Sequence, residues 1–402
     1  MLSVEKARDT ILSHLKTLPP EKVSLENALG RYLAEDIVSS IEIPASNNSA
    51  MDGYAVRCED ISSAGTTLTI SSVLPAGAVP ERPLEKGQAV KIMTGATIPA
   101  GADAVVKRED TKETQGSVTI QNVPKRHEHI RFRGEDITIG ATVLSAGDLI
   151  GPAQVGVLAS LRRLVVPVNQ RPVVAVIATG DEIAEIDEAV SPEKITSSNS
   201  YTLISLVRAS GGIPLYLGIA KDSRDNLKNK LDEARRSDLI LTSGGVSMGD
   251  YDIVRALMSE DGNTLVFWKV DMKPGRPLAF GSLAGIPAIG LPGNPVSTMT
   301  SFYQFARPAI LKMMGARNLL LPRIRARLAT ALEHTGDRPH FMRGVLEKKA
   351  EDLSVRPTGP QGSGILTSMA SGNCFIVLPK GKTHVDQGEY VECEVYHEIG
   401  LL

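Results

Sequence analysis

Several absences narrow the class of protein before any motif is considered. The 402-residue chain has three cysteines, Cys58, Cys374 and Cys393, and no CxxC spacing, so neither a disulfide framework nor a zinc site is expected. Aromatic residues make up 4%, too few to favour stacking platforms for nucleic-acid bases. No apolar run approaches the roughly 18–20 residues that span a bilayer, and the N-terminus has no signal-peptide pattern. We therefore expect a cytoplasmic protein that does not bind membranes.

The net charge of the chain does not indicate a strongly charged partner. The formal net charge is −2, so no global positive charge suggests nucleic-acid binding. Hydrophobic residues make up 42% and charged residues 22%, which is typical of a globular protein. A chain of 402 residues is too long for one ordinary core, so two to four domains are expected.

Hydrophobic periodicity predicts a multidomain α/β plus β protein with four regions. Helical spacing near residues 3–18 and 152–161 contrasts with short β-rich runs between 41 and 134. Apolar strands alternate with helices from 171 to 315, which predicts a doubly wound parallel sheet. Alternation returns after 322 and predicts a small β-barrel or sandwich. The predicted regions are an N-terminal helical linker (1–40 and 135–170), an inserted β domain (41–134), an α/β domain (171–320) and a C-terminal β domain (321–402).

Three loops of the predicted α/β domain share one pattern, an apolar strand followed by a glycine-containing polar loop and a helix. They are Thr179–Glu182, Ser243–Asp250 and Pro292–Pro295. Loops at the carboxyl ends of parallel strands lie along one sheet edge, where open α/β sheets bind ligands. We therefore expect these loops to form one crevice.

The loop 243–250 is the most informative of the three. Gly244 and Gly245 would let the backbone approach an anion, and the following helix would offer free N–H groups; a tight turn with glycines needed for packing is the alternative. Gly244 and Gly249 have P-loop spacing, but Asp250 stands in place of the lysine. GxGxxG is absent, which disfavours a dinucleotide-binding oxidoreductase. An aspartate here would repel a phosphate unless a cation intervened.

Carboxylates accumulate near these loops and suggest Mg²⁺, since hard oxygen ligands suit that ion. Any single one is more often a helix cap, which applies above all to Asp181 and Asp250. The group comprises Asp181, Glu182, Asp222, Asp250, Asp252 and Asp271.

Two cations lie on a rigid turn after the strand near 265–270. Lys273 and Arg276 are separated by Pro274 and Gly275, which suits phosphate or oxyanion capture; two solvated surface charges are the alternative. In the inserted β domain, Asp52 and Thr94 lie beside glycines, where they are ordinary turn residues on physical grounds alone.

The motifs together resemble one family, the molybdopterin molybdenumtransferases or bacterial MoeA proteins, whose animal counterpart is the C-terminal domain of gephyrin. The matching segments occur in family order and cover nearly the whole chain. They are Ser-Ala-Met-Asp-Gly-Tyr-Ala (49–55), Ile-Met-Thr-Gly-Ala (92–96), Arg-Gly-Glu-Asp-Ile (133–137), Thr-Gly-Asp-Glu (179–182), Ser-Gly-Gly-Val-Ser-Met-Gly (243–249), Lys-Pro-Gly-Arg-Pro (273–277), Leu-Pro-Gly-Asn-Pro (291–295) and Gly-Asn-Cys-Phe-Ile-Val-Leu (372–378).

The resemblance implies an elongated four-part subunit and a homodimer whose active cleft is shared between subunits. It implies insertion of molybdate into adenylylated molybdopterin, with Mg²⁺-dependent hydrolysis of the adenylate and release of AMP and molybdenum cofactor. Contacts with other enzymes of the cofactor pathway are also implied. The alternatives are a tungstate-specific version of the reaction, the adenylylating enzyme of the same pathway, and a non-catalytic scaffold that binds a partner peptide.

The family's functional residues, carried over by position, form three groups. The implied catalytic residues are Asp52, Thr94, Asp136, Glu182, Lys273 and Arg276. The implied substrate-binding residues are Gly180, Ser243, Gly244, Gly245, Ser247, Gly249, Pro292, Gly293, Asn294, Pro295, Arg343 and Ser363. The implied metal ligands are Glu182, Asp222 and either Asp250 or Asp252. Some members have a second lysine at the position of Arg276, which keeps the charge but changes the hydrogen-bonding geometry.

Overall fold

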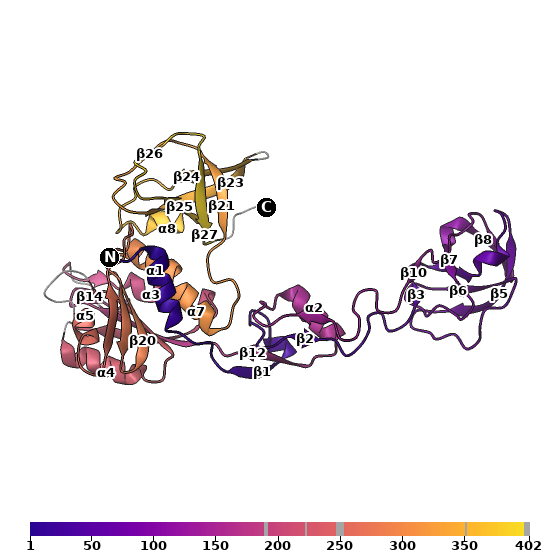
Figure 1. Cartoon of the computed structure of the whole chain (residues 1–402), viewed down its shortest axis with the longest axis horizontal. Coiled ribbons are helices and arrows are strands. Elements are labelled where there is room, and N and C mark those ends of the chain that lie inside the picture. The colour runs from indigo at the N-terminus through magenta and orange to yellow at the C-terminus, as the bar shows by residue number, and fades with distance from the viewer. Residues whose placement is uncertain (189–191, 222, 247–252, 350–351, 398–402) are drawn as a thin grey trace. The chain divides into compact units, whose positions relative to one another are not determined.

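The computed structural model describes the chain apart from residues 189–191, 222, 247–252, 350–351 and 398–402. The chain separates into two compact units. The first unit consists of residues 1–35, 146–155 and 165–402, and the second of residues 36–145 and 156–164. Each unit is described by itself below, with elements labelled as in Figure 1.

A six-stranded mixed sheet forms the centre of the first unit. Its strand order is β16-β13-β17-β20-β19-β18. The strands are β13 (Val173–Thr179), β16 (Ile213–Ala220), β17 (Leu239–Ser243), β18 (Thr264–Trp268), β19 (Ala279–Leu283) and β20 (Ile286–Leu291). The predicted parallel arrangement is confirmed for β16, β13, β17 and β20.

The other two strands correct the expectation of an all-parallel sheet. β19 is antiparallel to β20 and to β18. β19 and β20 are joined by Ala284 and Gly285, both with positive φ, as in the two-residue hairpins whose twist matches that of the strands. Ala-Gly is a weak hairpin signal, which explains why the sequence did not reveal β19. β18 still runs in the same direction as β20, so the turn that follows it reaches the same sheet edge.

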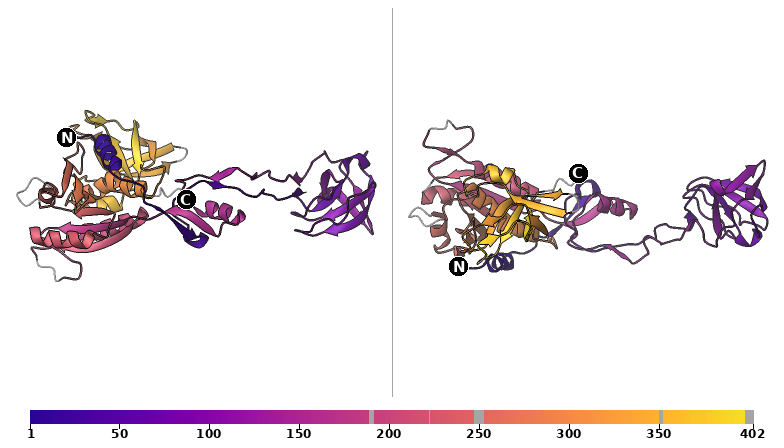
Figure 2. Two further views of the ribbon diagram at one scale, coloured as in Figure 1. Left: turned by 60° about the horizontal axis from the view of Figure 1, so that its bottom comes forward. Right: turned by 90° about the horizontal axis from the view of Figure 1, so that it is seen from above.

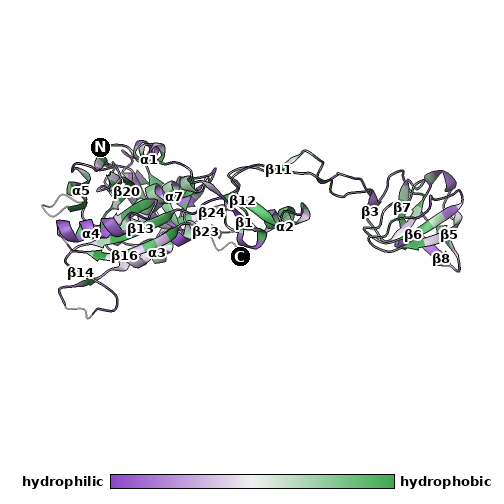
Figure 3. Ribbon diagram, turned by 90° about the horizontal axis from the view of Figure 1, so that it is seen from below, coloured by the Kyte–Doolittle hydropathy of each residue, from purple (hydrophilic) through white to green (hydrophobic). Residues whose placement is uncertain are grey.

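Helices cover both faces of this sheet, as the apolar run of β13 predicts. Val174 and Val176 pack in a core with α1 (Val4–Ser13), α3 (Ser198–Ala209) and α7 (Arg307–Met313). Ala175 and Ile177 pack in a second core with α4 (Arg224–Ala234) and α5 (Ile253–Met258). β13 is accordingly coloured as hydrophobic along its length in Figure 3, whereas α4 also carries hydrophilic residues.

The helix predicted after Pro295 is continuous but irregular. It consists of α6 (Pro295–Ser301), a π-helical segment η4 (Phe302–Ala306) and α7. The proline occupies the first turn of α6, where its missing N–H costs nothing. The first unit also contains β1 (Pro20–Ser24) paired with β12 (Val165–Asn169), η1 (Leu25–Asn27) and the short pair β14 (Ile183–Ala184) and β15 (Ile195–Thr196).

The predicted C-terminal β-barrel is confirmed as a closed five-stranded barrel (Figure 1). Its strands are β21 (Arg323–Leu328), β23 (His340–Lys349), β24 (Asp352–Pro357), β25 (Cys374–Leu378) and β27 (Tyr390–Val395). The pair β22 (Leu332–Glu333) and β26 (His384–Val385) and the helix α8 (Thr367–Ala370) accompany it. Alternate residues of β21, such as Ala326 and Leu328, fill the barrel core.

The second unit, coloured indigo to purple in Figure 2, is built around another sheet. This sheet has six strands in the order β7-β4-β6-β5-β9-β8. Its strands are β4 (Gly53–Val56), β5 (Thr67–Leu74), β6 (Gln88–Ile92), β7 (Ala104–Lys107), β8 (Thr111–Thr114) and β9 (Ser117–Ile120). Four of the six strands coincide with the predicted β-rich runs. β4 is fully buried, and a Cβ on Gly53 would lie 2.0 Å from Val106 O, so only glycine fits there.

Short pairs complete this part of the chain. β2 (Ile37–Val38) pairs with β11 (Thr142–Leu144), and β3 (Asn48–Ser49) pairs with β10 (Ile130–Arg131). The one-turn helices η2 (Cys58–Asp60) and η3 (Arg108–Asp110) lie between strands. The predicted helix after residue 152 is α2 (Pro152–Ser160). The segments predicted as a helical linker therefore also contain strands.

Candidate functional site

The three glycine-containing loops of the first unit line one cleft at the carboxyl edge of its sheet. The cleft has a volume of about 520 Å³. Pro277, from the turn that carries Lys273 and Arg276, also lines it. The residues of this ligand cleft include Thr179, Gly180, Glu182, Thr196, Ser197, Ser198, Asn199, Ser243, Gly244, Gly245, Val246, Pro277, Pro292, Gly293, Asn294, Pro295 and Ser297.

Glycines let two of these loops come into contact. Gly244 has φ +97°, and a Cβ there would lie 2.7 Å from Thr179 O. Gly245 has φ +67°, and a Cβ on Gly293 would lie 3.8 Å from the Cα of Gly244. A side chain at Gly244 would therefore be strained and would also clash with the neighbouring strand end. These close contacts support the packing explanation of the glycines, and the same tight turn forms part of the cleft wall.

The amide of Asn199, at the start of α3, joins two of these loops. Its Nδ2 donates to Ser243 Oγ at 2.8 Å and to Gly293 O at 2.7 Å. Ser197 and Ser200 form a buried hydroxyl pair beside it at 2.7 Å. Asn199 was not predicted from the sequence. The signal that could have found it is the run Ser-Ser-Asn-Ser (197–200) at the start of a helix.

Two helices present their positive dipole ends to the cleft, and α3 also offers N–H groups, whereas Pro295 at the start of α6 has no N–H and the N–H of Val296 donates to Ser363 O. α3 begins at Ser198 and α6 begins at Pro295, and both residues line the cleft. The residues before them, Ser197 and Asn294, make no side-chain capping bond to their helices. Free N–H groups at a helix start favour anions. The cleft is therefore suited to a ligand that carries phosphate.

Ser363 is predicted to bind substrate. It lies between two strands of the barrel in the sequence, and it contacts the start of α6. Its Oγ accepts from Asn294 Nδ2 at 3.1 Å, and its carbonyl accepts from the N–H of Val296 at 3.1 Å. The structure thus brings Ser363 together with Asn294, a predicted substrate-binding residue.

Arg343, the other predicted binding residue of the barrel, is fully buried. Its guanidinium donates to Ser368 Oγ at 2.9 Å and to the carbonyls of Gln361 and Gly362 at 3.2 and 3.0 Å. Burial lowers the pKa of Arg343 to about 10, which leaves it charged at neutral pH. These contacts hold residues 361–362, directly before Ser363, so Arg343 is placed within the barrel and not in the cleft lining.

The turn with Lys273 is hydrogen-bonded to the start of the barrel strand β23. The N–H of Lys273 donates to Pro339 O at 2.9 Å, and its carbonyl accepts from Phe341 N at 2.8 Å. The Lys273–Pro274 peptide bond is cis. Arg276 is exposed on the same turn. The cleft-lining residue between Arg276 and β19 is Pro277, and neither cation itself lines the cleft.

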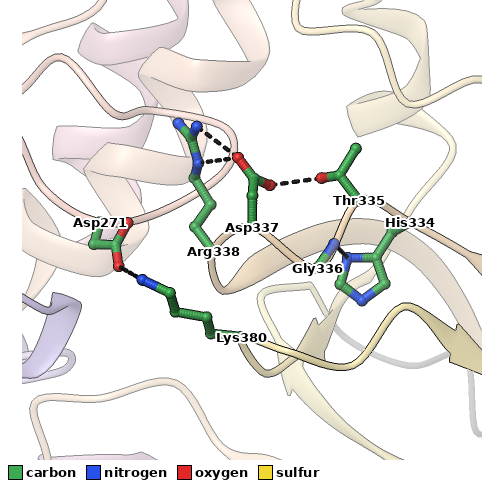
Figure 4. A network of polar contacts seen from close by, with 7 residues as sticks. All are labelled: Asp271, His334, Thr335, Gly336, Asp337, Arg338 and Lys380. Carbon is green, nitrogen blue, oxygen red and sulfur yellow. Dashed lines mark hydrogen bonds and ion pairs between the residues drawn. The ribbon is translucent and has the colours of Figure 1, made fainter.

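Polar contacts surround the point where this turn meets the barrel (Figure 4). Lys380 Nζ donates to Asp271 Oδ2 at 2.9 Å. The Thr335 hydroxyl and Arg338 donate to Asp337, and these bonds lower the pKa of Asp337 to about 2. His340 is 4% exposed, and burial, with the Lys273 charge as the next cause, lowers its pKa to about 4.

In the second unit, the structure brings Asp52 and Thr94 together. Asp52 Oδ1 accepts from the N–H of Thr94 at 2.7 Å and from its hydroxyl at 2.8 Å. These two bonds lower the pKa of Asp52 below its ordinary value. Asp136 is exposed after β10, where its N–H donates to Ile43 O at 3.0 Å. Among the described residues, no side-chain hydrogen bond or ion pair joins Asp136 to the Asp52–Thr94 pair.

Several predicted residues lie outside the described residues. They are Asp222, Ser247, Gly249, Asp250 and Asp252. Of the predicted metal ligands, Glu182 is described, is exposed and lines the cleft. The described residues contain no group of three or more His, Cys, Asp or Glu side chains arranged for a metal. The carboxylate of Glu182 is the kind of hard oxygen ligand that Mg²⁺ prefers. Among the described residues that line the cleft, Glu182 therefore supplies one suitable ligand for this ion.

The fold and the cleft define a multidomain α/β protein with a cleft at the carboxyl edge of its sheet. Three family models match consecutive parts of the chain. The MoeA N-terminal region (domain I and II) matches residues 2–161, a probable molybdopterin binding domain matches 175–312, and the MoeA C-terminal region (domain IV) matches 325–396.

Comparisons with individual proteins agree. The chain is 35% identical to a molybdopterin molybdenumtransferase of Haemophilus influenzae over 99% of this chain and 100% of the relative. It is 36% identical to molybdopterin molybdenumtransferase 2 of Mycobacterium tuberculosis over 98% and 99%. A crystal structure of the molybdopterin biosynthesis moeA protein from Pyrococcus horikoshii matches with a TM-score of 0.85 and 31% identity, covering 98% of this chain and 100% of that one.

The chain therefore belongs to the molybdopterin molybdenumtransferase family. Membership confirms the predicted resemblance, the multidomain fold and the enzyme class, a transferase, with a role in molybdenum cofactor biosynthesis. Throughout the residues that the structure describes, the helices are too short or too polar to cross a bilayer.

Proposed function

We propose that the chain inserts molybdate into adenylylated molybdopterin, with Mg²⁺-dependent hydrolysis of the adenylate and release of AMP and molybdenum cofactor. The observation that carries the proposal is the ligand cleft, where two helix starts and two glycine turns meet. Both substrates are negatively charged, so their approach requires N–H groups and cations that offset repulsion. The start of α3 would supply such N–H groups, and both helix starts would supply positive dipole ends.

The residues of the chain would act mainly by binding and orientation. The turn at Gly244 and Gly245 would hold the phosphates close to the backbone, and Asn199 would keep that turn in register with Gly293. Positioning is the main requirement of phosphoryl chemistry with a good leaving group. Glu182, with Asp222 and Asp250 or Asp252, would hold Mg²⁺, and the ion, when bound, would neutralise phosphate charge.

Lys273 and Arg276 complete the proposal as oxyanion-binding cations on the turn beside Pro277. The oxyanion would be molybdate as co-substrate, and tungstate is the alternative that shares its geometry. Asp52 and Thr94, which are bonded to each other, and Asp136 would contribute from the second unit in the predicted homodimer.

The experiment mixes the purified chain with adenylylated molybdopterin, Mg²⁺ and either molybdate or tungstate, and measures AMP and cofactor in each arm. We expect AMP release with molybdate and its loss when Mg²⁺ is chelated. Release with tungstate alone would support the alternative metal, and no AMP in any arm would refute the assignment and favour a scaffold.

The metal assignment has its own test. Asp222→Asn and Asp252→Asn are each expected to abolish Mg²⁺-dependent AMP release while the thermal unfolding midpoint stays within a few degrees of wild type. Unchanged turnover in both variants would remove these residues from the metal site.

A further inference from the structure

The single tryptophan of the chain contacts the wall of the ligand cleft from behind. Trp268 is the last residue of β18 and is partly buried. Its indole Nε1–H donates to the carbonyl of Val246 at 3.0 Å. Val246 is 1% exposed and lines the cleft directly after Gly244 and Gly245. Trp268 itself does not line the cleft, so any effect it has on a ligand passes through this turn.

Two cations hold the indole ring in place. Arg255 Cζ lies 4.4 Å from the ring centroid, and Lys269 Nζ lies 3.7 Å from it. Lys269 has φ +80°, a left-handed conformation that costs a lysine free energy. Cation–π attraction is strongest over tryptophan, so these contacts restrain the direction of the indole N–H. A strained residue kept beside the ring is typical of a position where geometry matters for function.

Backbone hydrogen bonds and the packing of Val246 in a hydrophobic core also restrain the turn 244–246. Gly244 and Gly245 are the residue type with the greatest backbone freedom. The N–H of Gly244 donates to Leu291 O at 3.0 Å, and Gly245 O accepts from Arg255 N at 3.5 Å. Among the residues that the structure describes, the indole hydrogen bond joins these two, and it acts at the Val246 end of the turn.

We propose that Trp268 is a positioning residue for the ligand-binding turn Gly244–Val246, which it holds in its anion-binding conformation through the indole N–H. The identity of the ligand, an adenylylated pterin, rests on the proposed function. The effect of Trp268 on the position of the turn does not depend on that function. A purely structural tryptophan, packed against the core of β18, would affect stability alone.

The test removes the N–H without removing the ring. Trp268 is replaced by 3-benzothienylalanine, which keeps the bicyclic shape and lacks the donor, and separately by phenylalanine. Val266→Ala, a change at an exposed residue of the same strand, is the control. The first readout is amide hydrogen exchange of the peptide 239–246 in the ligand-free chain. Loss of one hydrogen bond to a buried carbonyl is expected to speed exchange about fivefold in both Trp268 variants and not in the control.

The second readout is the kinetics of AMP release. We expect KM for adenylylated molybdopterin to rise about fivefold in the benzothienylalanine variant, with kcat within twofold and an unchanged thermal midpoint. Unchanged exchange of 239–246, or a lower midpoint with unchanged KM, would overturn the proposal. If wild type releases no AMP, the proposed function fails, and the exchange readout alone decides the role of Trp268.

Discussion

Asn199 offers a sharp test of the cleft because one amide group joins two loops. In Asn199→Ala both donated bonds are lost, the 2.8 Å bond to Ser243 Oγ and the 2.7 Å bond to Gly293 O. A typical hydrogen bond contributes about 1 kcal/mol, so the variant loses about 2 kcal/mol of loop organisation. If all of it appears in substrate binding and turnover, kcat/KM for AMP release falls about 30-fold.

Two further variants make this prediction specific. Asn199→Asp places a carboxylate against Gly293 O and adds negative charge to an anion-binding cleft, so it is expected to lose more activity than Asn199→Ala. The control is Asn122→Ala in the second unit, which removes one hydrogen bond from the side-chain amide to Asp110 at the surface. Thermal unfolding measured beside kcat/KM separates loss of folding from loss of the site. The reasoning is refuted if Asn199→Ala stays within twofold of wild type in kcat/KM, or if Asn199→Asp is the more active of the two.

Three other predictions concern charge and burial. In Asp52→Asn the hydrogen bonds from Thr94 weaken, so calorimetry should show a lower thermal midpoint than wild type at pH 7. Because the pKa of Asp52 is lowered in the folded state, wild type loses this advantage as the carboxylate is protonated. The difference in midpoint should therefore close as the pH drops below about 4. Arg343→Met leaves buried carbonyls without donors, so urea titration should show the free energy of unfolding to fall by about 3 kcal/mol. Arg343→Lys should restore this stability only in part. The segment with Ser363 should become more sensitive to protease in Arg343→Met. The pKa of His340 is lowered to about 4 in the folded state, so as the pH falls the unfolded chain takes up the proton first. The free energy of unfolding of wild type should therefore fall by up to about 3 kcal/mol between pH 6.5 and 4. Urea titrations at each pH should show that His340→Asn removes this pH dependence of stability.

The sequence predicted those parts of the fold that leave a hydrophobic signal. The apolar run Val173–Ile177 identified a strand covered on both faces, and β13 has one core on each side. The glycine loops were correctly placed on one edge because parallel strands fix where their ends lie. β19 was missed because its hairpin turn is Ala-Gly and because Pro277 and Gly281 interrupt the apolar pattern.

The cleft was predicted in outline but not in its contacts. Asn199 was missed because an amide in a serine-rich run is indistinguishable from a helix cap until Ser243 and Gly293 are placed beside it. Arg343 carried a family role, yet its burial among carbonyls could be seen only after the barrel formed. Such contacts join residues far apart in the chain, and no local pattern encodes them.

The most direct measurement is a crystal structure of the full chain grown with adenylylated molybdopterin. We expect electron density for the ligand in the cleft, with its phosphates within hydrogen-bonding distance of the backbone N–H of Gly245 or of the N–H groups at the start of α3, which begins at Ser198. Ligand density elsewhere, for example in the second unit's pocket between Ser71 and Val90, with the ligand cleft empty, would contradict it.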